Sequence, residues 1–223
     1  GHPYSWDVIG EMKDLANATI DDVKEFHKKF YIPNNATLVV SGDYEVAEVK
    51  ALIQKYFAEI PAGEELSDPE PMTVTLAETK KLYHEDGFAR APQYTMVYPV
   101  AQQFTKDSYS LDVLAQLLGV GKNSPLYKVL VKEKKLTSNV SAYNQSQELA
   151  GQMQISVTAN PSTSLNDVEK AIFEAFERFE TDKFTERDLE RIKAGLERNF
   201  YLMMSSVMYK GFMLAMYNEL AGS

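Results

Sequence analysis

The residues that most often carry hydrolytic chemistry are scarce in this chain. Its histidines are His2, His27 and His84, and the closest two are 25 positions apart. A helical zinc site of the peptidase type needs two histidines four residues apart, with a glutamate between them to act as base. Cysteine is absent, which excludes thiolate catalysis, and there is no Gly-x-Ser-x-Gly elbow. The residues alone predict no catalytic group and no metal ligand.

Segment 119–124, Gly-Val-Gly-Lys-Asn-Ser, has some features of a phosphate-binding loop. In such a loop glycines let backbone amides surround a phosphate, and a lysine reaches the terminal group. The match is incomplete, because Gln116 occupies the position of the leading glycine and Asn123 replaces the serine or threonine that would hold magnesium. The segment also follows a predicted helix instead of a strand. We therefore interpret it as a glycine-rich helix terminus.

A basic cluster overlaps the end of this segment. Glu133 partly offsets its members, which are Lys122, Lys128, Lys132, Lys134 and Lys135. A solvated helix face is the simplest interpretation of such a run. The alternative is a patch that accepts acidic groups from a peptide or from the first part of the chain.

Composition and charge exclude several classes of protein. The chain has 223 residues, of which 44% are hydrophobic and 25% charged, as is typical of a globular protein. The net charge is −9, so a non-specific electrostatic grip on nucleic acid is not expected. Residues 1–75 carry −8 and residues 76–223 carry −1. The lack of cysteine leaves the cellular compartment open.

A linker is predicted at residues 63–71, between segments 1–62 and 72–223. The stretch from Pro61 to Pro71 contains three prolines, one glycine and four acidic residues. This composition is typical of a linker, and the stretch also lacks the apolar periodicity of a helix or strand.

Before the linker the pattern predicts a helix, a strand and a second helix. Thr19 can cap the first helix, whose buried face would be Ile20, Val23, Phe26 and Phe30. Residues 36–40 are predicted to form a short buried strand. The second helix spans about 45–57, and its expected buried residues are Val46, Val49, Leu52, Ile53, Tyr56 and Phe57.

After the linker, strands are expected at 73–76, 80–86 and 93–100, and helices at 106–118 and 125–135. Two strands of opposite sense follow at 137–145 and 151–160, and the next helix carries Leu165, Val168, Ile172, Phe176 and Phe179. Thr185 and Asp188 have the spacing of a capping box at the start of the last long helix. Strands mixed with helices, with hairpin-like neighbours, indicate an α+β fold with antiparallel pairing.

The most apolar stretch is 200–217, in which Lys210 is the only charged residue. It is nearly long enough to cross a bilayer. Lys210 in the middle, together with Ser205 and Ser206, makes a membrane span costly, and the many methionines suit packing against protein. We expect a helix buried against neighbouring elements. Because the sequence starts at Gly1 and ends directly after a helical pattern, we also expect it to be part of a longer protein.

Ordered motifs run along nearly the whole chain. The first group is His2-Pro-Tyr4, Thr19-x-x-Asp22-x-x-x-Phe26, Tyr31-x-Pro-Asn34-Asn-Ala-x-Leu38-Val-Val-x-Gly42-Asp43 and Lys55-Tyr-Phe57-x-x-Ile60-Pro61. The second group is Gly119-x-Gly121-Lys-x-Ser124-x-Leu126-Tyr-Lys, Leu130-Val-Lys132-x-Lys134-Lys-Leu136, Ala150-Gly151 and Thr185-x-x-Asp188-Leu189. In content and order they closely resemble the pitrilysin/insulinase family of zinc metallopeptidases, which includes the mitochondrial processing peptidase.

The resemblance implies a metallohydrolase-like α+β fold, with mixed or antiparallel sheets, helices packed on one face, and two partial domains. Residues 1–62 would be the C-terminal part of the zinc-bearing domain, and residues 72–223 the following metal-free domain, truncated at its end. In this family zinc is held by His-x-x-Glu-His and a distal Glu, which precede the point where this sequence begins. The chain itself is therefore expected to bind no cofactor, and the zinc to belong to the parent protein.

The resemblance also implies a role in a peptide-holding chamber, around which two such domains form one half of a clamshell. The candidate residues of the chamber wall are Ser124, Leu126, Val131, Leu136 and Ser138. Family members often carry an Arg and a Tyr in this segment, which contact the bound peptide or transition state. Alignment on Ser124, Leu126 and Leu136 puts Val131 and Ser138 at those positions, and neither supplies the charge or the phenol hydroxyl. Catalytic assistance by this chain is therefore not expected.

Two functions remain open at this point. The first is a non-catalytic, chamber-forming segment of a zinc-dependent metalloendopeptidase that degrades or processes peptides. The second is a segment of a catalytically inactive relative that acts as a peptide-binding or partner subunit. The expected partners are a peptide or unfolded protein, through the parent protein, and the remaining domains of the same chain. If both domains are incomplete, some of their apolar faces lack a partner, and we also expect the isolated chain to self-associate. The bacterial periplasm is the compartment that fits best.

Overall fold

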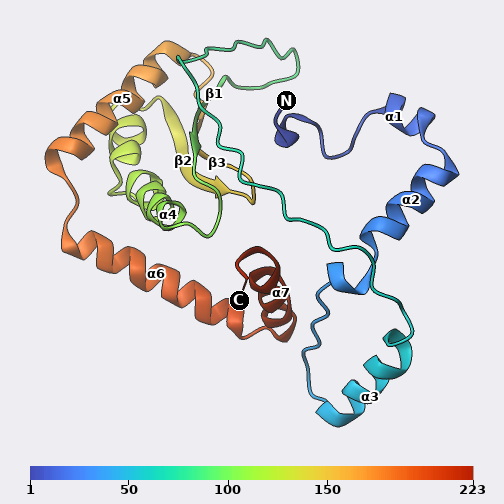
Figure 1. The fold of residues 1–223 in the computed structure, drawn as a ribbon. Helices are drawn as coiled ribbons and strands as arrows, with labels where there is room; N and C mark the ends of the chain where they lie inside the picture. Colours follow the sequence, from blue (N-terminus) through green and yellow to red (C-terminus); the bar gives the residue numbers. More distant parts are fainter. Residues whose placement is uncertain (223) are drawn as a thin grey trace. The chain divides into compact units, whose positions relative to one another are not determined.

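The computed structural model describes residues 1–222 and divides the chain into two compact units (Figure 1). Unit 1 consists of residues 1–69 together with the segment from residue 201 onward, and unit 2 consists of residues 70–200. The step between Pro69 and Glu70 falls in the predicted linker. The C-terminal segment groups with unit 1, whereas the sequence-based division places it with residues 72–200.

Unit 2 is built on a three-stranded antiparallel sheet. Its strands are β1 (Gln93–Val100), β2 (Thr137–Ser146) and β3 (Gly151–Ala159), in the order β1-β3-β2. Ile155 in the central strand pairs with Met96 on one side and Ala142 on the other. Alternate β3 residues from Met153 to Ala159 are buried, so one face of the sheet belongs to the core. These are the three strands that the sequence predicts in this region with nearly the same bounds.

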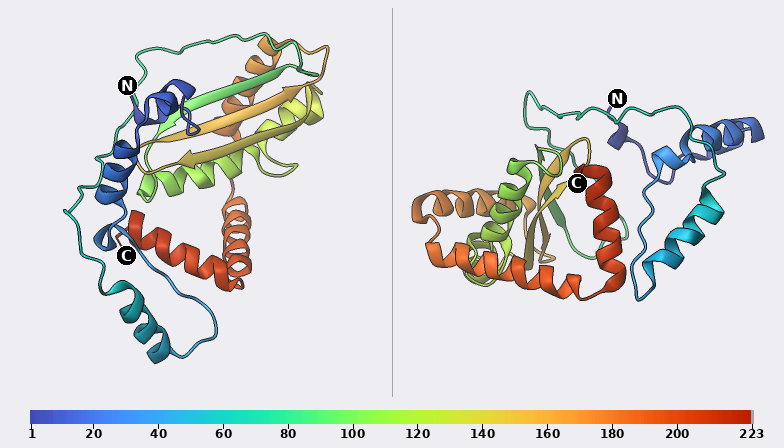
Figure 2. Two further views of the ribbon diagram at one scale, coloured as in Figure 1. Left: turned by 90° about the vertical axis from the view of Figure 1, so that its right-hand side faces the viewer. Right: turned by 60° about the horizontal axis from the view of Figure 1, so that its bottom comes forward.

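The helices of unit 2 pack on that one face (Figure 2). They are α4 (Lys106–Gly119), η3 (Tyr127–Glu133) and α5 (Leu165–Asp182). After them comes α6 (Glu186–Met204). The core between sheet and helices includes the fully buried side chains Leu126, Val129, Leu130, Ile155, Val157, Val168 and Ile172. An α+β fold with antiparallel strands and helices on one face is thereby confirmed. The helix predicted at 125–135 is present, but residues 127–133 are wound as a π-helix.

A capping box begins α6, as the sequence predicts. The Thr185 amide donates to Asp188 Oδ2 at 3.0 Å, and the Asp188 amide donates to Thr185 Oγ1 at 3.2 Å. The Thr185 hydroxyl hydrogen-bonds the same carboxylate and lowers the pKa of Asp188 from its usual range. These bonds satisfy amides that the first turn of a helix leaves without partners.

Replacing Thr185 with alanine is expected to lower the free energy of unfolding by about 1 kcal/mol, the usual cost of losing an N-cap. Thr181→Ala is the matched control, because the Thr181 hydroxyl donates to the Glu177 carbonyl within α5 and caps no helix start. Alanine favours a helix at that position. Urea unfolding followed by circular dichroism checks both variants. Equal destabilisation of the two would contradict the assigned role of Thr185.

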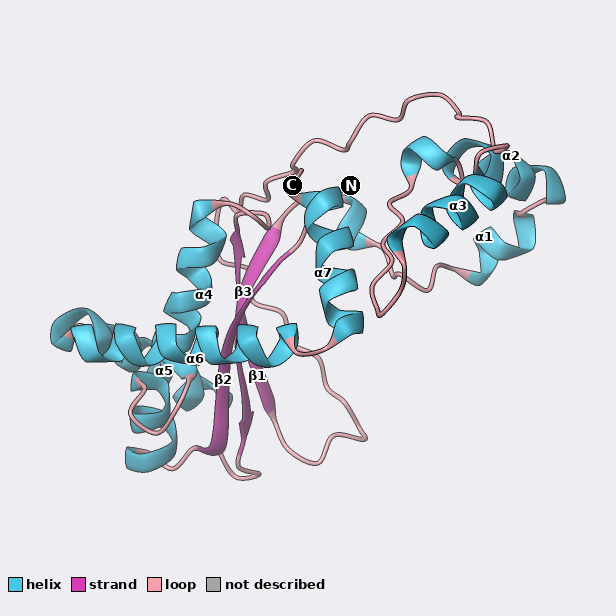
Figure 3. Ribbon diagram, turned by 90° about the horizontal axis from the view of Figure 1, so that it is seen from below, coloured by secondary structure: helices cyan, strands magenta, loops and turns pink. Residues whose placement is uncertain are grey.

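The strands predicted at 73–76 and 80–86 are wrong. Residues 70–92 form a long loop that leads into β1 (Figure 3). The Met72 amide donates to the Leu149 carbonyl at 2.8 Å, and Lys81 Nζ lies 2.7 Å from Glu169 on α5. Strand propensity favours an extended backbone, but a strand also needs a partner, and these residues have no ladder partner within residues 1–222.

Unit 1 contains helices and no strand among its described residues. Its elements are η1 (Pro3–Ser5), α1 (Met12–Asn17), α2 (Ile20–Phe30), η2 (Pro33–Asn35), α3 (Val46–Phe57) and α7 (Val207–Leu220). The strand predicted at 36–40 is therefore wrong, for the same reason as above. Segment 37–41 instead contacts α7, since Ser41 Oγ donates to the Val207 carbonyl and Asn218 Nδ2 to Thr37 Oγ1, each at 3.0 Å. Gly211 allows this approach, because a Cβ there would lie 2.7 Å from Ser41 Oγ.

The apolar faces predicted to be buried in α2 and α3 are largely exposed. Val23 is 58% exposed, Phe26 57% and Leu52 50%, while Ile32 is the only buried hydrophobic side chain described in unit 1. Amphipathic periodicity identifies which face of a helix seeks a partner, and the helices of unit 1 have no sheet to pack on.

The buried helix predicted at 200–217 is also wrong. The stretch breaks at Ser205, and α7 begins after Ser206, whose hydroxyl accepts from the Tyr209 amide at 3.3 Å. Met208 is 82% exposed, and Phe212 and Leu214 are each 62% exposed. Within residues 1–222, none of the helices has the length and apolar character required to span a membrane.

Candidate functional site

The five candidate wall residues lie between the end of α4 and the start of β2, with Val131 in η3 and Ser138 in β2, but their exposure differs. Ser124 is buried and Leu126 is completely buried in the core. Val131 and Leu136 are half-buried and pack against that core. Ser138, on β2, is exposed. Of the five, Ser138 therefore presents the most surface, and Leu126 holds the segment in place from inside.

Close packing accounts for the glycines before Ser124. α4 ends at Gly119, where a Cβ would lie 2.7 Å from the Ala142 Cβ of β2. Gly121 has φ +87°, a conformation that side chains disfavour. Ser124 then begins the next helix, because its Oγ donates to the Gly121 carbonyl at 2.9 Å and accepts from the Tyr127 amide at 3.4 Å. The segment is the glycine-rich helix terminus that the sequence predicts.

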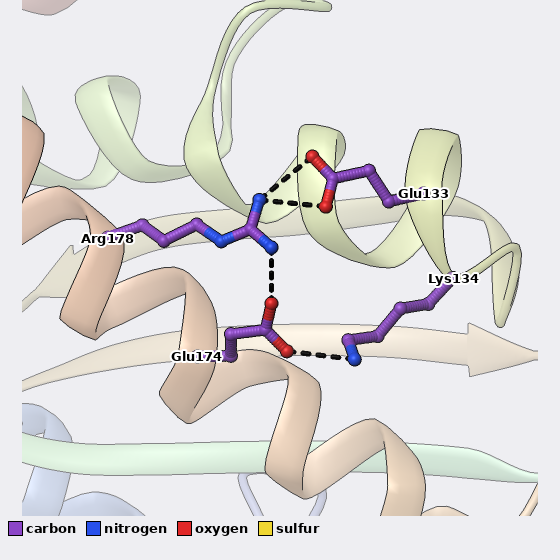
Figure 4. A network of polar contacts seen from close by, with 4 residues as sticks. All are labelled: Glu133, Lys134, Glu174 and Arg178. Atoms are coloured by element: carbon purple, nitrogen blue, oxygen red, sulfur yellow. Dashed lines mark hydrogen bonds and ion pairs between the residues drawn. The ribbon is translucent and has the colours of Figure 1, made fainter.

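Charged side chains tie the π-helix to α5 (Figure 4). Lys134 Nζ lies 2.8 Å from Glu174, Arg178 lies 2.7 Å from Glu133, and Arg178 also contacts Glu174. The hydrogen bond from Lys134 lowers the pKa of Glu174, and the hydrogen bond to Glu133 raises that of Arg178. Lys134 is thus engaged inside unit 2, and Lys132 lies over the Tyr127 ring at 6.0 Å.

Charge reversal at Arg178 is expected to lower the midpoint of thermal unfolding by a few degrees, because Glu133 and Glu174 would then face a third carboxylate. High salt should reduce the difference, since these side chains are partly exposed. The contribution of Glu174 is present above its unfolded pKa and is lost as pH falls through its lower folded pKa. Wild type and Arg178→Glu should therefore converge in acid. Differential scanning fluorimetry against pH and salt checks this, and an undiminished difference in acid would contradict it.

The sheet of unit 2 has a second face, on the side away from the helices (Figure 2, left). Three cross-strand rungs lie on it, as the strand register gives directly: Thr95–Ser156–Ser141, Val97–Gln154–Tyr143 and Pro99–Gln152–Gln145. Tyr143 OH donates to Gln154 Oε1 at 2.7 Å, and Gln152 Nε2 donates to Gln145 Oε1 at 3.3 Å. We call this surface the open face. It is uncharged and rich in amides and hydroxyls.

Sequence reasoning missed the open face as a feature. The sequence of β3 does show polar residues alternating with buried apolar ones. The polar residues are Gln152, Gln154, Ser156 and Thr158. Alternation predicts an exposed face, but the rungs across three strands follow only from the register.

The described residues do not fit a zinc site. Within residues 1–222, no three His, Cys, Asp or Glu side chains come close enough together to hold a metal ion. His27 stacks on Tyr31 with ring centroids 4.9 Å apart, and His84 is exposed in the 70–92 loop.

The fold is similar to those of solved protease structures. The crystal structure of a protease from Helicobacter pylori superposes with a TM-score of 0.79 at 29% identity, covering 99% of this chain and 54% of that one. The first half of the periplasmic protease PqqL from Escherichia coli superposes with a TM-score of 0.68 at 19% identity, covering 96% and 47%.

The sequence profile of the peptidase M16 inactive domain matches residues 17–196. The chain therefore belongs to the peptidase M16 family and corresponds to its inactive domain, which confirms the resemblance seen in the sequence. Zinc protease PqqE of Helicobacter pylori is 30% identical over 211 residues, which cover 92% of this chain and 47% of that protein. The chain thus spans about half the length of this curated relative.

Proposed function

We propose that this chain is a non-catalytic, chamber-forming segment of a zinc-dependent metalloendopeptidase that degrades or processes peptides or unfolded proteins. The observation that carries the proposal is the match to the M16 inactive domain over residues 17–196, in a chain that covers about half of a zinc protease. Residues 1–62 would form the C-terminal part of the zinc-bearing domain. Residues 72–223, after the 63–71 linker, would form the metal-free domain. Zinc would be held elsewhere in the parent protein.

The open face of the sheet supports the chamber role. A chamber wall must contact many sequences without holding any of them tightly, and an uncharged polar surface suits that task. Elsewhere on unit 2, Val131, Leu136 and Ser138 would contribute further surface, while Ser124 and Leu126 would position the segment. The periplasm is the proposed compartment, because the structurally similar PqqL is a periplasmic protease.

The parent reading frame upstream of Gly1 tests this proposal. A His-x-x-Glu-His motif with a downstream Glu would support a working zinc peptidase. Replaced ligands would contradict it and favour the alternative, a catalytically silent relative that binds peptides or a partner subunit.

The isolated chain is expected to self-associate. The exposed side chains of α2, α3 and α7 include Phe26, Leu52, Met208 and Phe212, which the remaining domains of the parent protein would cover. Light scattering should show an average mass that rises with concentration for residues 1–223. The full-length parent serves as the control, with a constant mass. A chain that stays monomeric at high concentration would contradict the expectation.

A further inference from the structure

We propose that a cationic patch on unit 2 binds carboxylate-rich stretches of the polypeptide that the parent protein holds. The patch consists of Lys122, Lys128 and Lys132, from the segment that follows α4, and of Arg191 on α6, and all four residues are exposed. The inference rests on the proposed function and adds a substrate class to it, which is polypeptide rich in aspartate or glutamate.

Two neighbouring elements bring the cations of the patch together. Arg191 Nη1 would lie 3.4 Å from a Cβ at Gly121, so the start of α6 lies beside the glycine-rich segment that also carries Lys122. Lys128 and Lys132 are four residues apart on η3, and residues at this spacing are neighbours on one side of a helix. The patch therefore presents four positive charges close to one another.

Acidic side chains leave most of this charge uncompensated. Asp188 Oδ1 lies 3.8 Å from Arg191 Nη2, while Asp188 Oδ2 accepts the hydrogen bonds from Thr185. Those hydrogen bonds are the largest cause of the lowered pKa of Asp188, and the charges of Arg191 and Lys128 lower it further. Both cations thus lie near this carboxylate. Within residues 1–222, none of the three lysines of the patch forms an ion pair.

The acid next to Lys132 on η3 is engaged elsewhere. Glu133 pairs with Arg178 of α5 and so points away from the patch (Figure 4). Lys128 and Lys132 are then like charges at a four-residue spacing, which destabilises a helix, whereas opposite charges at this spacing stabilise it. A solvated helix face gains nothing from this arrangement. A bound carboxylate would relieve the repulsion.

The size and surroundings of the patch favour a peptide over nucleic acid. Single-stranded nucleic acid is held by stacking its bases on exposed aromatic rings, but Tyr127 is half-buried and Lys132 Nζ covers its ring at 6.0 Å. Duplex binding involves about 6–10 phosphate contacts, which exceeds the cations of the patch, and the net charge of −9 repels such a polyanion. A short run of carboxylates on a peptide matches four cations that one acid partly offsets.

The test measures peptide binding to the full-length parent with its zinc removed, so that no turnover occurs. Three unfolded peptides of equal length carry several Glu, Gln or Lys residues at the same positions. At low salt the Glu peptide is expected to bind about tenfold more tightly than the Gln peptide, and the Lys peptide more weakly than both. High salt should reduce the difference to less than about twofold, because the patch is exposed.

Charge reversal by Lys128→Glu together with Lys132→Glu should weaken binding of the Glu peptide at least about tenfold, tighten the Lys peptide and leave the Gln peptide unchanged. The neutral pair Lys128→Gln and Lys132→Gln should abolish the preference without adding negative charge, and it replaces the reversed variant if that variant folds poorly. Lys106→Glu is the matched control. Lys106 is exposed at the start of α4, about 20 Å along the helix from Gly119, which is beyond the screening length of salt, so the preference should persist.

Equal binding of the Glu and Gln peptides at low salt, or a preference that survives the charge reversal, would overturn the inference while leaving the proposed function intact. A parent that binds none of the peptides would overturn both. A single-stranded oligonucleotide that binds more tightly than the Glu peptide, and loses this binding in the reversed variant, would identify a phosphate-bearing partner and would also overturn the inference.

Discussion

The full-length parent protein is expected to cleave unfolded polypeptide and to lose this activity when a chelator removes zinc, whereas residues 1–223 alone release no fragments above the blank. Enzymes accelerate their reactions at least about 10⁶-fold, and in a zinc peptidase this depends on metal-activated water. Cleavage should therefore be detected with the zinc-loaded parent and be absent with the chelated parent and with residues 1–223. The residues that the structure describes hold no cluster of metal ligands that could supply this chemistry.

Mass spectrometry of an unfolded substrate, incubated with each protein in the presence and absence of added zinc, checks this result. A catalytically silent parent, with no chelator-sensitive cleavage, would favour the partner-subunit alternative. Zinc-dependent cleavage by residues 1–223 alone would contradict the account outright.

Replacing Ile155 with alanine is expected to lower the free energy of unfolding of unit 2 by about 2–5 kcal/mol, a large part of the 5–15 kcal/mol typical of a domain. Ile155 is completely buried in the central strand, between Met96 and Ala142. Its removal leaves a cavity that the sheet and three packed helices can fill only by distorting.

Val97→Ala is the matched control, because Val97 lies on the open face of the neighbouring strand and is 45% exposed. Its cost should stay below about 1 kcal/mol. Urea unfolding of both variants measures the difference. Similar costs for the two would mean that the helices do not cover the face of the sheet that carries Ile155.

Elements that carry their own pattern could be predicted from the sequence. Strand β1 has the predicted bounds, and β2 and β3 differ from prediction by one residue, since period-two alternation with turn residues determines them locally. The Thr185–Asp188 capping box needs only its four-residue spacing. The family resemblance followed from ordered motifs in the same way.

Features that depend on distant partners could not be predicted. Segments 36–40, 73–76 and 80–86 have strand-like composition, but pairing is decided by residues elsewhere in three dimensions. Phe26 and Leu52 are on the apolar faces of helices, and periodicity cannot say whether a partner is present to bury them. Leu126 and Ser138 were both assigned to one wall, although their exposure differs completely.

The zinc content of the full-length parent and of residues 1–223, each purified and measured by elemental mass spectrometry, tests the central claim most directly. The account predicts about one tightly bound zinc per parent chain, as for a single peptidase site, and none retained by residues 1–223. One zinc per chain in residues 1–223 alone, or none in the parent, would contradict it.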